Sequence, residues 1–230
     1  MKIENTKISN FFALSDAVSL SNMLCGFFSI IASLNGEFYI ASLLMICSVV
    51  FDSVDGWVAK KINRNDEFEF GKNIDSLSDV ISFGASPALF VYCISRTVEN
   101  SPTIAIIIVC MMIMICGVLR LTRYNAINNY ISFKGFIGFP ITGIDIILVS
   151  YYFTGLFNIY AACVLMAIVS LFMISNIKYM KLDNVKIISI AVVLIVLMLV
   201  PLPLKLFNVN IPALFLLLIC LYYLISGLIK

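Results

Sequence analysis

The chain has 230 residues, of which 62% are hydrophobic and only 12% are charged, with a formal net charge of +2. Soluble domains are about half apolar and about a quarter charged, so this composition excludes a soluble enzyme, a disordered chain and a disulfide scaffold, and it predicts an integral membrane protein. The sequence holds no histidine, which excludes a Ser-His-Asp or Cys-His nucleophile and a histidine-bound zinc or haem.

A membrane-spanning helix needs roughly 20 predominantly apolar residues, and the sequence contains eight windows of that kind. In chain order they are residues 16–35, 38–61, 73–95, 102–120, 138–155, 158–176, 185–201 and 210–228. The longest connections between them are 62–72, 121–137 and 177–184. We therefore predict an all-α integral membrane protein with eight spans and no separate soluble domain.

The lysines and arginines indicate how these spans are oriented. If the N-terminus is cytoplasmic, only Arg96 and Lys205 fall outside, which leaves 13 of the 15 basic residues inside. This bias predicts an even number of spans with both termini in the cytoplasm. We interpret the basic residues as topology anchors and contacts for anionic membrane lipids, and we expect no nucleic-acid partner.

The composition changes along the chain. Residues 16–176 carry Asp, Arg, Gly, Asn and Ser within or beside the membrane, whereas residues 185–230 are almost entirely aliphatic and contain three prolines. We therefore predict a cytoplasmic N-terminal segment at 1–15, a membrane core at 16–176 that holds the function, and an accessory C-terminal hairpin of two helices at 177–230.

Four aspartates gather where the second window meets the third. Asp52 and Asp55 are three residues apart near the end of 38–61, and Asp75 and Asp79 are four apart near the start of 73–95. On a helix each pair projects from one face. Because the two helices run antiparallel, all four carboxylates can meet in one site near the cytoplasmic side of the membrane.

Clustered carboxylates in a membrane need a positive partner, because each costs at least about 2.5–3.5 kcal/mol at the bilayer centre and like charges repel one another. Lys60, Lys61 and Lys72 are close in sequence, but they can reach solvent or lipid phosphate instead. One or two divalent cations are therefore the better explanation, and all-oxygen ligands suit Mg²⁺ or Mn²⁺, and also Ca²⁺.

Small residues accompany the aspartates. Gly56 and Ala59 lie on or close to the face of Asp52 and Asp55, and Gly71 marks the turn into the third span. A helix surface without side chains admits a close-approaching ligand, which indicates a slot for a pyrophosphate whose charge the metal and a lysine would offset. The alternative is a helix-packing notch beside a water-filled vestibule lined by the aspartates.

These residues resemble the signature of the CDP-alcohol phosphotransferases, D-x-x-D-G-x-x-A-R-x8-G-x-x-x-D-x-x-x-D. In this sequence the matching run is Asp52-x-x-Asp55-Gly56-x-x-Ala59-Lys60, followed by Gly71-x-x-x-Asp75-x-x-x-Asp79. Lys60 replaces the arginine, which keeps the charge but loses the bidentate fork. Ten residues rather than eight precede Gly71, and neither departure removes an expected metal ligand.

Further segments are similar to the phosphatidylserine synthase branch of that superfamily, whose archaeal members make archaetidylserine and often carry additional C-terminal helices. These segments are residues 22–26, 75–84, 116–125 and 136–140. The resemblance covers about residues 16–176 and implies a six-helix core and a homodimer.

The resemblance implies a reaction in which the hydroxyl of L-serine attacks the β-phosphorus of a CDP-lipid, releasing CMP and leaving a phosphodiester. It implies that Asp52, Asp55 and Asp75 bind one Mg²⁺ or Mn²⁺ ion and that a second ion involves Asp79. Asp79 is also the candidate general base, since a carboxylate is the available proton acceptor in a chain without histidine. Whether Asp79 is base or only ligand stays open here.

The resemblance also implies which residues contact the substrates. The positions that match those binding the cytidine diphosphate are Gly56, Ala59, Lys60 and Gly71. For the serine carboxylate and the lipid phosphate, the best donors are Arg120 and Arg123, three residues apart at the cytoplasmic end of the fourth span, with Lys134 as a weaker candidate. Topology anchoring is the alternative role for these cations.

The expected protein is thus a multi-pass enzyme of the cytoplasmic membrane whose active site faces the cytoplasm. Another acceptor alcohol, such as glycerol phosphate or inositol phosphate, is an alternative within the superfamily. From another class, a cation-coupled transporter also uses intramembrane carboxylates, but it favours midplane sites in repeated halves, and we find no internal repeat.

Overall fold

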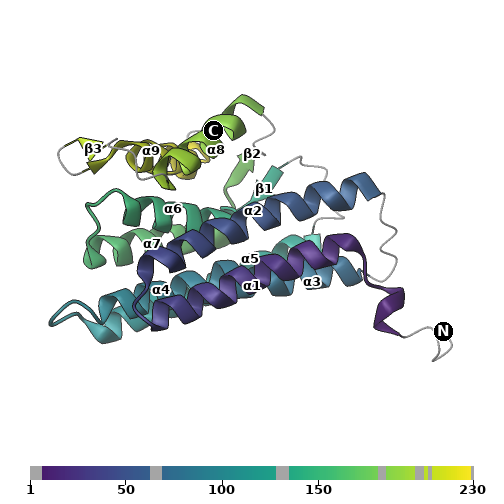
Figure 1. The fold of residues 1–230 in the computed structure, drawn as a ribbon, viewed down its shortest axis with the longest axis horizontal. Helices are drawn as coiled ribbons and strands as arrows, with labels where there is room; N and C mark the ends of the chain where they lie inside the picture. The colour runs from purple at the N-terminus through teal and green to yellow at the C-terminus, as the bar shows by residue number, and fades with distance from the viewer. Residues whose placement is uncertain are drawn as a thin grey trace.

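The computed structural model describes residues 7–62, 69–127, 135–180, 185–199, 205–206 and 209–228. The described chain is mostly helical (Figure 1). Its first half comprises the 3₁₀ turn η2 (Ile8–Asn10), α1 (Leu14–Leu34), α2 (Phe38–Ile62), α3 (Phe70–Asp79), the π-helical segment η3 (Val80–Ala85), α4 (Ser86–Ser95) and α5 (Thr103–Ile127). The second half adds α6 (Thr142–Phe153), α7 (Ile159–Ile174), α8 (Val185–Leu199) and α9 (Ile211–Ser226).

Two small antiparallel sheets that the sequence did not predict accompany the helices, which make up most of the described chain. Strand β1 (Gly135–Ile137) pairs with β2 (Lys178–Met180), and β3 (Lys205–Leu206) pairs with β4 (Val209–Asn210). In the first sheet Phe136 lies opposite Tyr179. This pairing fastens the segment that precedes α6 to the segment that follows α7.

Each of the eight predicted windows holds a helix, although the helices differ in length. Four are long and apolar enough to cross a membrane, namely Leu14–Leu34, Phe38–Val58, Phe70–Ser95 and Thr103–Ile127. The third of these is α3, η3 and α4 in one continuous helix. The other four apolar helices of the described chain are shorter; the 12 residues of α6 reach only about 18 Å, so complete crossing by these four stays a prediction.

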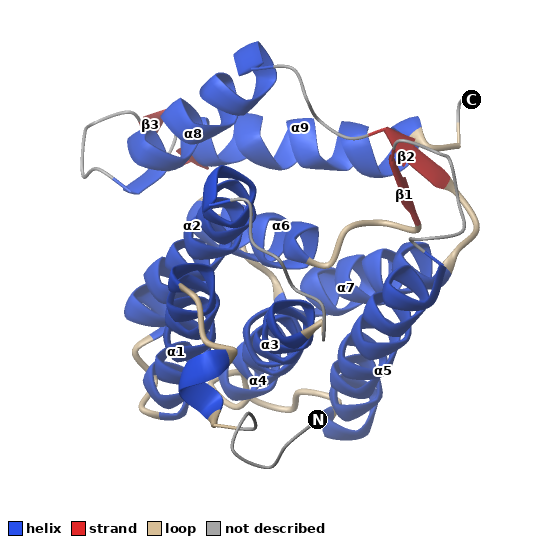
Figure 2. Cartoon of the chain, turned by 90° about the vertical axis from the view of Figure 1, so that its right-hand side faces the viewer, coloured by secondary structure: helices blue, strands red, loops and turns tan. Residues whose placement is uncertain are grey.

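Helices α1 and α5 pack on opposite sides of the continuous helix α3–η3–α4 (Figure 2). Helices α1 and α2 pack along each other, α7 packs on α5, and α6 lies between α2 and α9. Helices α8 and α9 form an outer layer against α6 (Figure 1).

Helix α1 has the polarity that a lipid environment predicts. Its buried face is small and polar, while apolar side chains such as Leu24, Phe27 and Phe28 are exposed. On this face Ser29 Oγ donates to the main-chain oxygen of Ala41 at 3.0 Å and accepts from Ser86 Oγ, also at 3.0 Å. Small and hydroxyl-bearing residues are typical of helix interfaces in membranes, so the chain is a multi-pass membrane protein.

Two predicted boundaries were wrong. Helix α5 continues to Ile127, so the connection expected at 121–137 is helical in its first part, and Arg120 lies within a helix rather than at its end. Gly71 is not the turn residue, because α3 begins at Phe70 and the left-handed residue is Glu69, with φ of +53°.

Gly26 allows α1 and η3 to approach closely. A Cβ atom at this position would lie 2.5 Å from Ser82 Cα, in the main chain of η3. We therefore expect Gly26→Ala to destabilise the protein by about 1–3 kcal/mol through overpacking, seen as a lower Tm in detergent. Gly56→Ala is the matched control, since no atom lies within 4 Å of the corresponding Cβ; an equal loss of Tm in both variants would contradict this account.

Candidate functional site

A cavity of about 560 Å³ lies at one end of the bundle, where α1 and α3 begin and α2 ends. Its walls come from α1, α2, α3, α5 and residues 136–142. Its polar and charged lining residues are Ser15, Asp16, Ser19, Asp52, Asp55, Lys72, Asp75, Ser76, Asp79, Arg120, Tyr124, Asn125 and Thr142. A cavity of this size, with polar groups converging on it, is typical of a small-molecule site.

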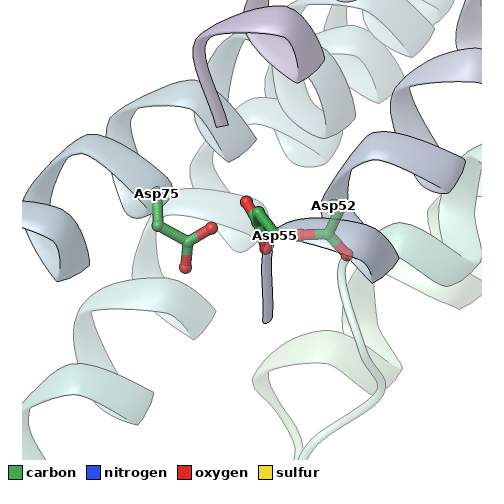
Figure 3. A group of neighbouring side chains, drawn as sticks. All are labelled: Asp52, Asp55 and Asp75. Atoms are coloured by element: carbon green, nitrogen blue, oxygen red, sulfur yellow. The ribbon is translucent and has the colours of Figure 1, made fainter. Parts of the chain in front are cut away.

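Three of the four signature aspartates form a tight cluster in this cavity. One carboxylate oxygen from each of Asp52, Asp55 and Asp75 lies within 4.8 Å of the other two (Figure 3). Asp79 lines the same cavity and is only 6% exposed. Its carboxyl group faces that of Asp52, but it is not a member of the cluster of three. The structure thus brings all four predicted acids to one cavity, with Asp79 beside the cluster of three.

The cluster has the composition of a divalent-cation site. Among the described residues, no lysine or arginine forms an ion pair with Asp52, Asp55 or Asp75; the described ion pair at this end joins Lys72 to Glu69. Carboxylate oxygens are the ligands that Mg²⁺ and Mn²⁺ prefer, and three ionised carboxylates this close together repel one another, which a bound cation relieves. These residues therefore fit the metal that the sequence predicts.

Two side chains of α1 that the signature does not include hold the acids in place. Ser19 Oγ donates to Asp55 Oδ2 at 2.7 Å, and Asn22 Nδ2 donates to Asp79 Oδ1 at 3.1 Å. Sequence reasoning missed Ser19, because a serine in an apolar window has no distinguishing pattern. The available signal was its position on the same helical face as Asn22, three residues later.

Arg120 is the cation that faces the acids. Its side chain is 6% exposed, and its guanidinium carbon lies 5.4 Å from the ring centre of Tyr124 and 5.6 Å from that of Phe136. Its charge is close enough to interact with Asp79 and Asp52. Arg120 can therefore present its guanidinium to an anion in the cavity while cation–π contacts with Tyr124 and Phe136 stabilise its position.

Arg123 has different neighbours and does not line the cavity. Its Nη1 donates to the main-chain oxygen of Ile174 at 2.9 Å, and its Nη2 donates to those of Ile137 at 2.9 Å and Met173 at 3.0 Å. The guanidinium thus joins the C-terminal turn of α7 to β1. The predicted contact of Arg123 with substrate stays a prediction, and Lys134 lies outside the described residues.

Two of the four residues predicted to bind the cytidine diphosphate line the cavity, namely Gly56 and Gly71. The space beside Gly56 is open, because nothing lies within 4 Å of where a Cβ atom would stand. Ala59 and Lys60 belong to α2, but their side chains lie outside the part of the chain that the structure describes.

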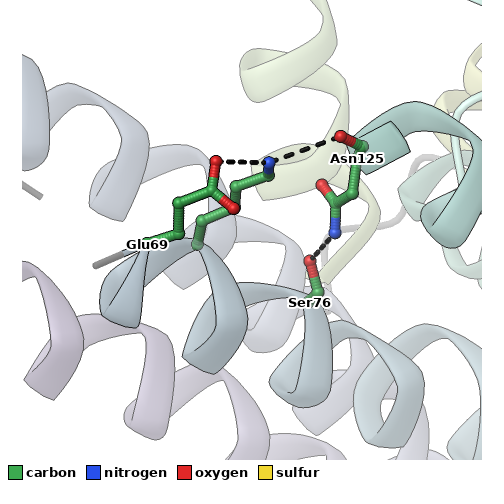
Figure 4. A network of polar contacts seen from close by, with 4 residues as sticks. Glu69, Ser76 and Asn125 are labelled. Atoms are coloured by element: carbon green, nitrogen blue, oxygen red, sulfur yellow. Dashed lines mark hydrogen bonds and ion pairs between the residues drawn. The ribbon is translucent and has the colours of Figure 1, made fainter. Parts of the chain in front are cut away.

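A polar network closes the rim of the cavity between α3 and α5 (Figure 4). Lys72 Nζ contacts Glu69 Oε1 at 3.1 Å and the main-chain oxygen of Asn125 at 3.4 Å. Asn125 Nδ2 donates to Ser76 Oγ at 2.7 Å. These contacts fix the distance between the acids of α3 and Arg120 on α5.

Comparison with known proteins agrees with this geometry. Archaetidylserine synthase of Methanothermobacter thermautotrophicus is 41% identical over 182 residues, which is 79% of this chain and 76% of that protein. CDP-diacylglycerol–serine O-phosphatidyltransferase of Methanocaldococcus jannaschii is 37% identical over 97% of this chain and 96% of its own length, and the enzyme of that name from Bacillus subtilis is 27% identical over 70% and 86%. The sequence model of the CDP-alcohol phosphatidyltransferases matches residues 12–174, and the chain belongs to this family.

Proposed function

We propose that the protein transfers the phosphatidyl or archaetidyl group of a CDP-lipid to the hydroxyl of L-serine, with release of CMP, in phospholipid biosynthesis. The observation that carries this proposal is the convergence of the four signature aspartates and Arg120 on one cavity. The relatives named as serine phosphatidyltransferase and archaetidylserine synthase support the choice of serine as acceptor.

The carboxylates of Asp52, Asp55 and Asp75 would bind the metal, with Asp79 as a further ligand if two ions are present. When bound, Mg²⁺ or Mn²⁺ would hold the pyrophosphate and stabilise the charge that develops on the departing CMP. Gly56 and Gly71 leave the pyrophosphate room to approach the helices, and we propose that Ala59 and Lys60 contact the same cytidine diphosphate.

In the reaction the serine oxygen forms a bond to the β-phosphorus, and the bond from that phosphorus to the bridging oxygen breaks. CMP leaves with the electron pair of that bond. The proton of the serine hydroxyl passes to the carboxylate of Asp79, which lines the cavity beside the cluster of three. A carboxylate beside the cluster that is not one of its three members can accept this proton, and we give Asp79 the role of general base on that ground.

We assign anion recognition to Arg120, whose guanidinium can bind the serine carboxylate or the lipid phosphate bidentately. Arg123 and Lys134 remain candidates for the same role from the sequence. In the described chain Arg123 already donates to three main-chain oxygens. We therefore expect it to act by holding residues 135–142, which form one wall of the cavity, in place.

We place the protein in the cytoplasmic membrane with eight spans, both termini inside and the cavity facing the cytoplasm. The distribution of the 15 lysines and arginines supports this orientation. We further propose a catalytic six-helix core at 16–176, an accessory hairpin at 177–230 and a homodimer; the homodimer rests on resemblance to the family alone.

The acceptor is tested with the purified protein, each of CDP-diacylglycerol and CDP-archaeol, and a panel of L-serine, glycerol phosphate, inositol phosphate, choline and ethanolamine. We expect CMP release only with L-serine, and only with Mg²⁺ or Mn²⁺ present. Release with another acceptor would replace serine as the substrate. Full release under chelator would contradict the role given to the acids, and cation flux in vesicles without CMP release would favour a transporter.

Asp75→Asn removes one of the three clustered carboxylates, and we expect it to abolish turnover and to weaken Mn²⁺ binding at least about tenfold. Mn²⁺ binding is read from the electron paramagnetic resonance signal of the free ion. Asp145→Asn is the matched control, because Asp145 is fully buried in α6 and does not line the cavity. Unchanged Mn²⁺ affinity in Asp75→Asn would rule out this cation site.

Arg120→Gln should mainly lower activity, whereas Arg123→Gln should mainly lower stability. Loss of a charge-assisted hydrogen bond of about 1.5–3 kcal/mol predicts that Arg120→Gln lowers kcat/KM roughly 10- to 100-fold. Arg123→Gln leaves three main-chain oxygens without their donor, so it should lower Tm in detergent more than Arg120→Gln does. A larger Tm loss in Arg120→Gln, with activity lost mainly in Arg123→Gln, would reverse the assignment.

A further inference from the structure

Helix α1 donates to two of the acids from adjacent positions on one face. Ser19 and Asn22 are 4% and 0% exposed, and their donors reach Asp55 at 2.7 Å and Asp79 at 3.1 Å. Asp55 lies on α2 and Asp79 on α3, so one turn of α1 sets the orientation of carboxylates on two other helices. Neither donor belongs to the signature or has a role in the mechanism above.

The position of Asn22 is itself fixed by the helix that carries Asp79. Ser82 Oγ donates to the main-chain oxygen of Asn22 at 2.9 Å. One turn further along α1, Gly26 packs against the main chain of Ser82, with no room for a Cβ atom. These main-chain contacts fix the backbone of α1 at Asn22, and so they fix the direction from which the Asn22 side-chain amide donates to Asp79.

The two acids differ in what surrounds them. Asp55 is a member of the cluster of three whose oxygens lie within 4.8 Å of one another, whereas Asp79 is not. A neutral amide or hydroxyl donor orients a carboxylate without supplying a charge that would compete with a bound cation. A lysine in either place would offer such a competing charge.

We propose that Ser19 and Asn22 are positioning residues with separate effects, and this rests on the proposed function. Ser19 orients Asp55 for binding the divalent cation. Asn22 orients Asp79 toward the hydroxyl of the acceptor. One face of α1 thus controls cation affinity and turnover through two different side chains.

The test compares Ser19→Ala and Asn22→Ala in the full-length purified protein, with Mn²⁺ binding measured without substrates and CMP release measured at saturating Mn²⁺. We expect Ser19→Ala to weaken Mn²⁺ binding about tenfold and to keep most of kcat once Mn²⁺ saturates. Asn22→Ala should keep the Mn²⁺ affinity of the site formed by Asp52, Asp55 and Asp75 within about twofold and lower kcat roughly 10- to 100-fold, with KM for the CDP-lipid little changed. Ser19→Thr, which keeps the hydroxyl donor, should restore Mn²⁺ affinity.

Ser29→Ala is the matched control. Ser29 lies on the same buried face of α1 and also donates a hydrogen bond, but its partners are the main-chain oxygen of Ala41 and the hydroxyl of Ser86, away from the acids. Ser29→Ala therefore measures the effect of losing a buried hydroxyl outside the acidic site. If Asn22→Ala does not fold, Asn22→Leu keeps the volume and removes the donor.

Equal effects of Ser19→Ala and Asn22→Ala on Mn²⁺ affinity and kcat would overturn the proposal, as would effects no larger than those of Ser29→Ala. If the wild-type protein released no CMP with any acceptor, the proposed function would fail. The Mn²⁺ measurement would then still decide the role of Ser19, because it does not require turnover.

Discussion

The arrangement of the site depends on one interaction, the mutual repulsion of the clustered carboxylates. Asp52, Asp55 and Asp75 bring oxygens within 4.8 Å of one another in a cavity at one end of the bundle. Hydrogen bonds from α1 and the nearby charge of Arg120 stabilise the acids in part. A divalent cation would supply the remaining positive charge. Because binding it would relieve the repulsion between the carboxylates, that repulsion contributes to the affinity for the metal. Part of the polar inner face of α1 meets the same constraint, since Ser19 and Asn22 supply donors to Asp55 and Asp79.

The chemically important part of the site is local in sequence, which is why it was predictable. The spacing Asp52–Asp55 and Asp75–Asp79 follows the helical period, and antiparallel consecutive helices bring the two pairs together without any long-range information. Contacts made across the sequence were not predictable in this way. The three main-chain acceptors of Arg123 come from residues 14, 50 and 51 positions away. Its spacing from Arg120 therefore predicted that both arginines reach the substrate, whereas in the structure only Arg120 lines the cavity.

The errors in the fold have the same origin. An apolar window ends where hydropathy falls, but the backbone hydrogen bonds of a helix do not depend on apolar side chains, so α5 continues through residues 121–127, where Tyr124 and Asn125 line the cavity. Strands β1 and β2 have three residues each and pair across more than 40 positions, which leaves no local periodicity to detect. The left-handed Glu69 takes the place expected for Gly71 because α3 begins one residue before the glycine.

The continuous helix Phe70–Ser95 connects the acidic site to the rest of the bundle. Of the residues in its most apolar stretch 67% are buried, a larger share than in the other three long apolar helices. The helix changes from α to π geometry immediately after Asp79. π-Helical segments are frequent at functional sites because the wider turn redirects side chains. Here the segment carries Ser82, which binds the main chain of Asn22 while Asn22 binds Asp79. The hydrogen bonds therefore form a closed loop between α1 and the third span, and displacement of either helix would move the Asp79 carboxylate.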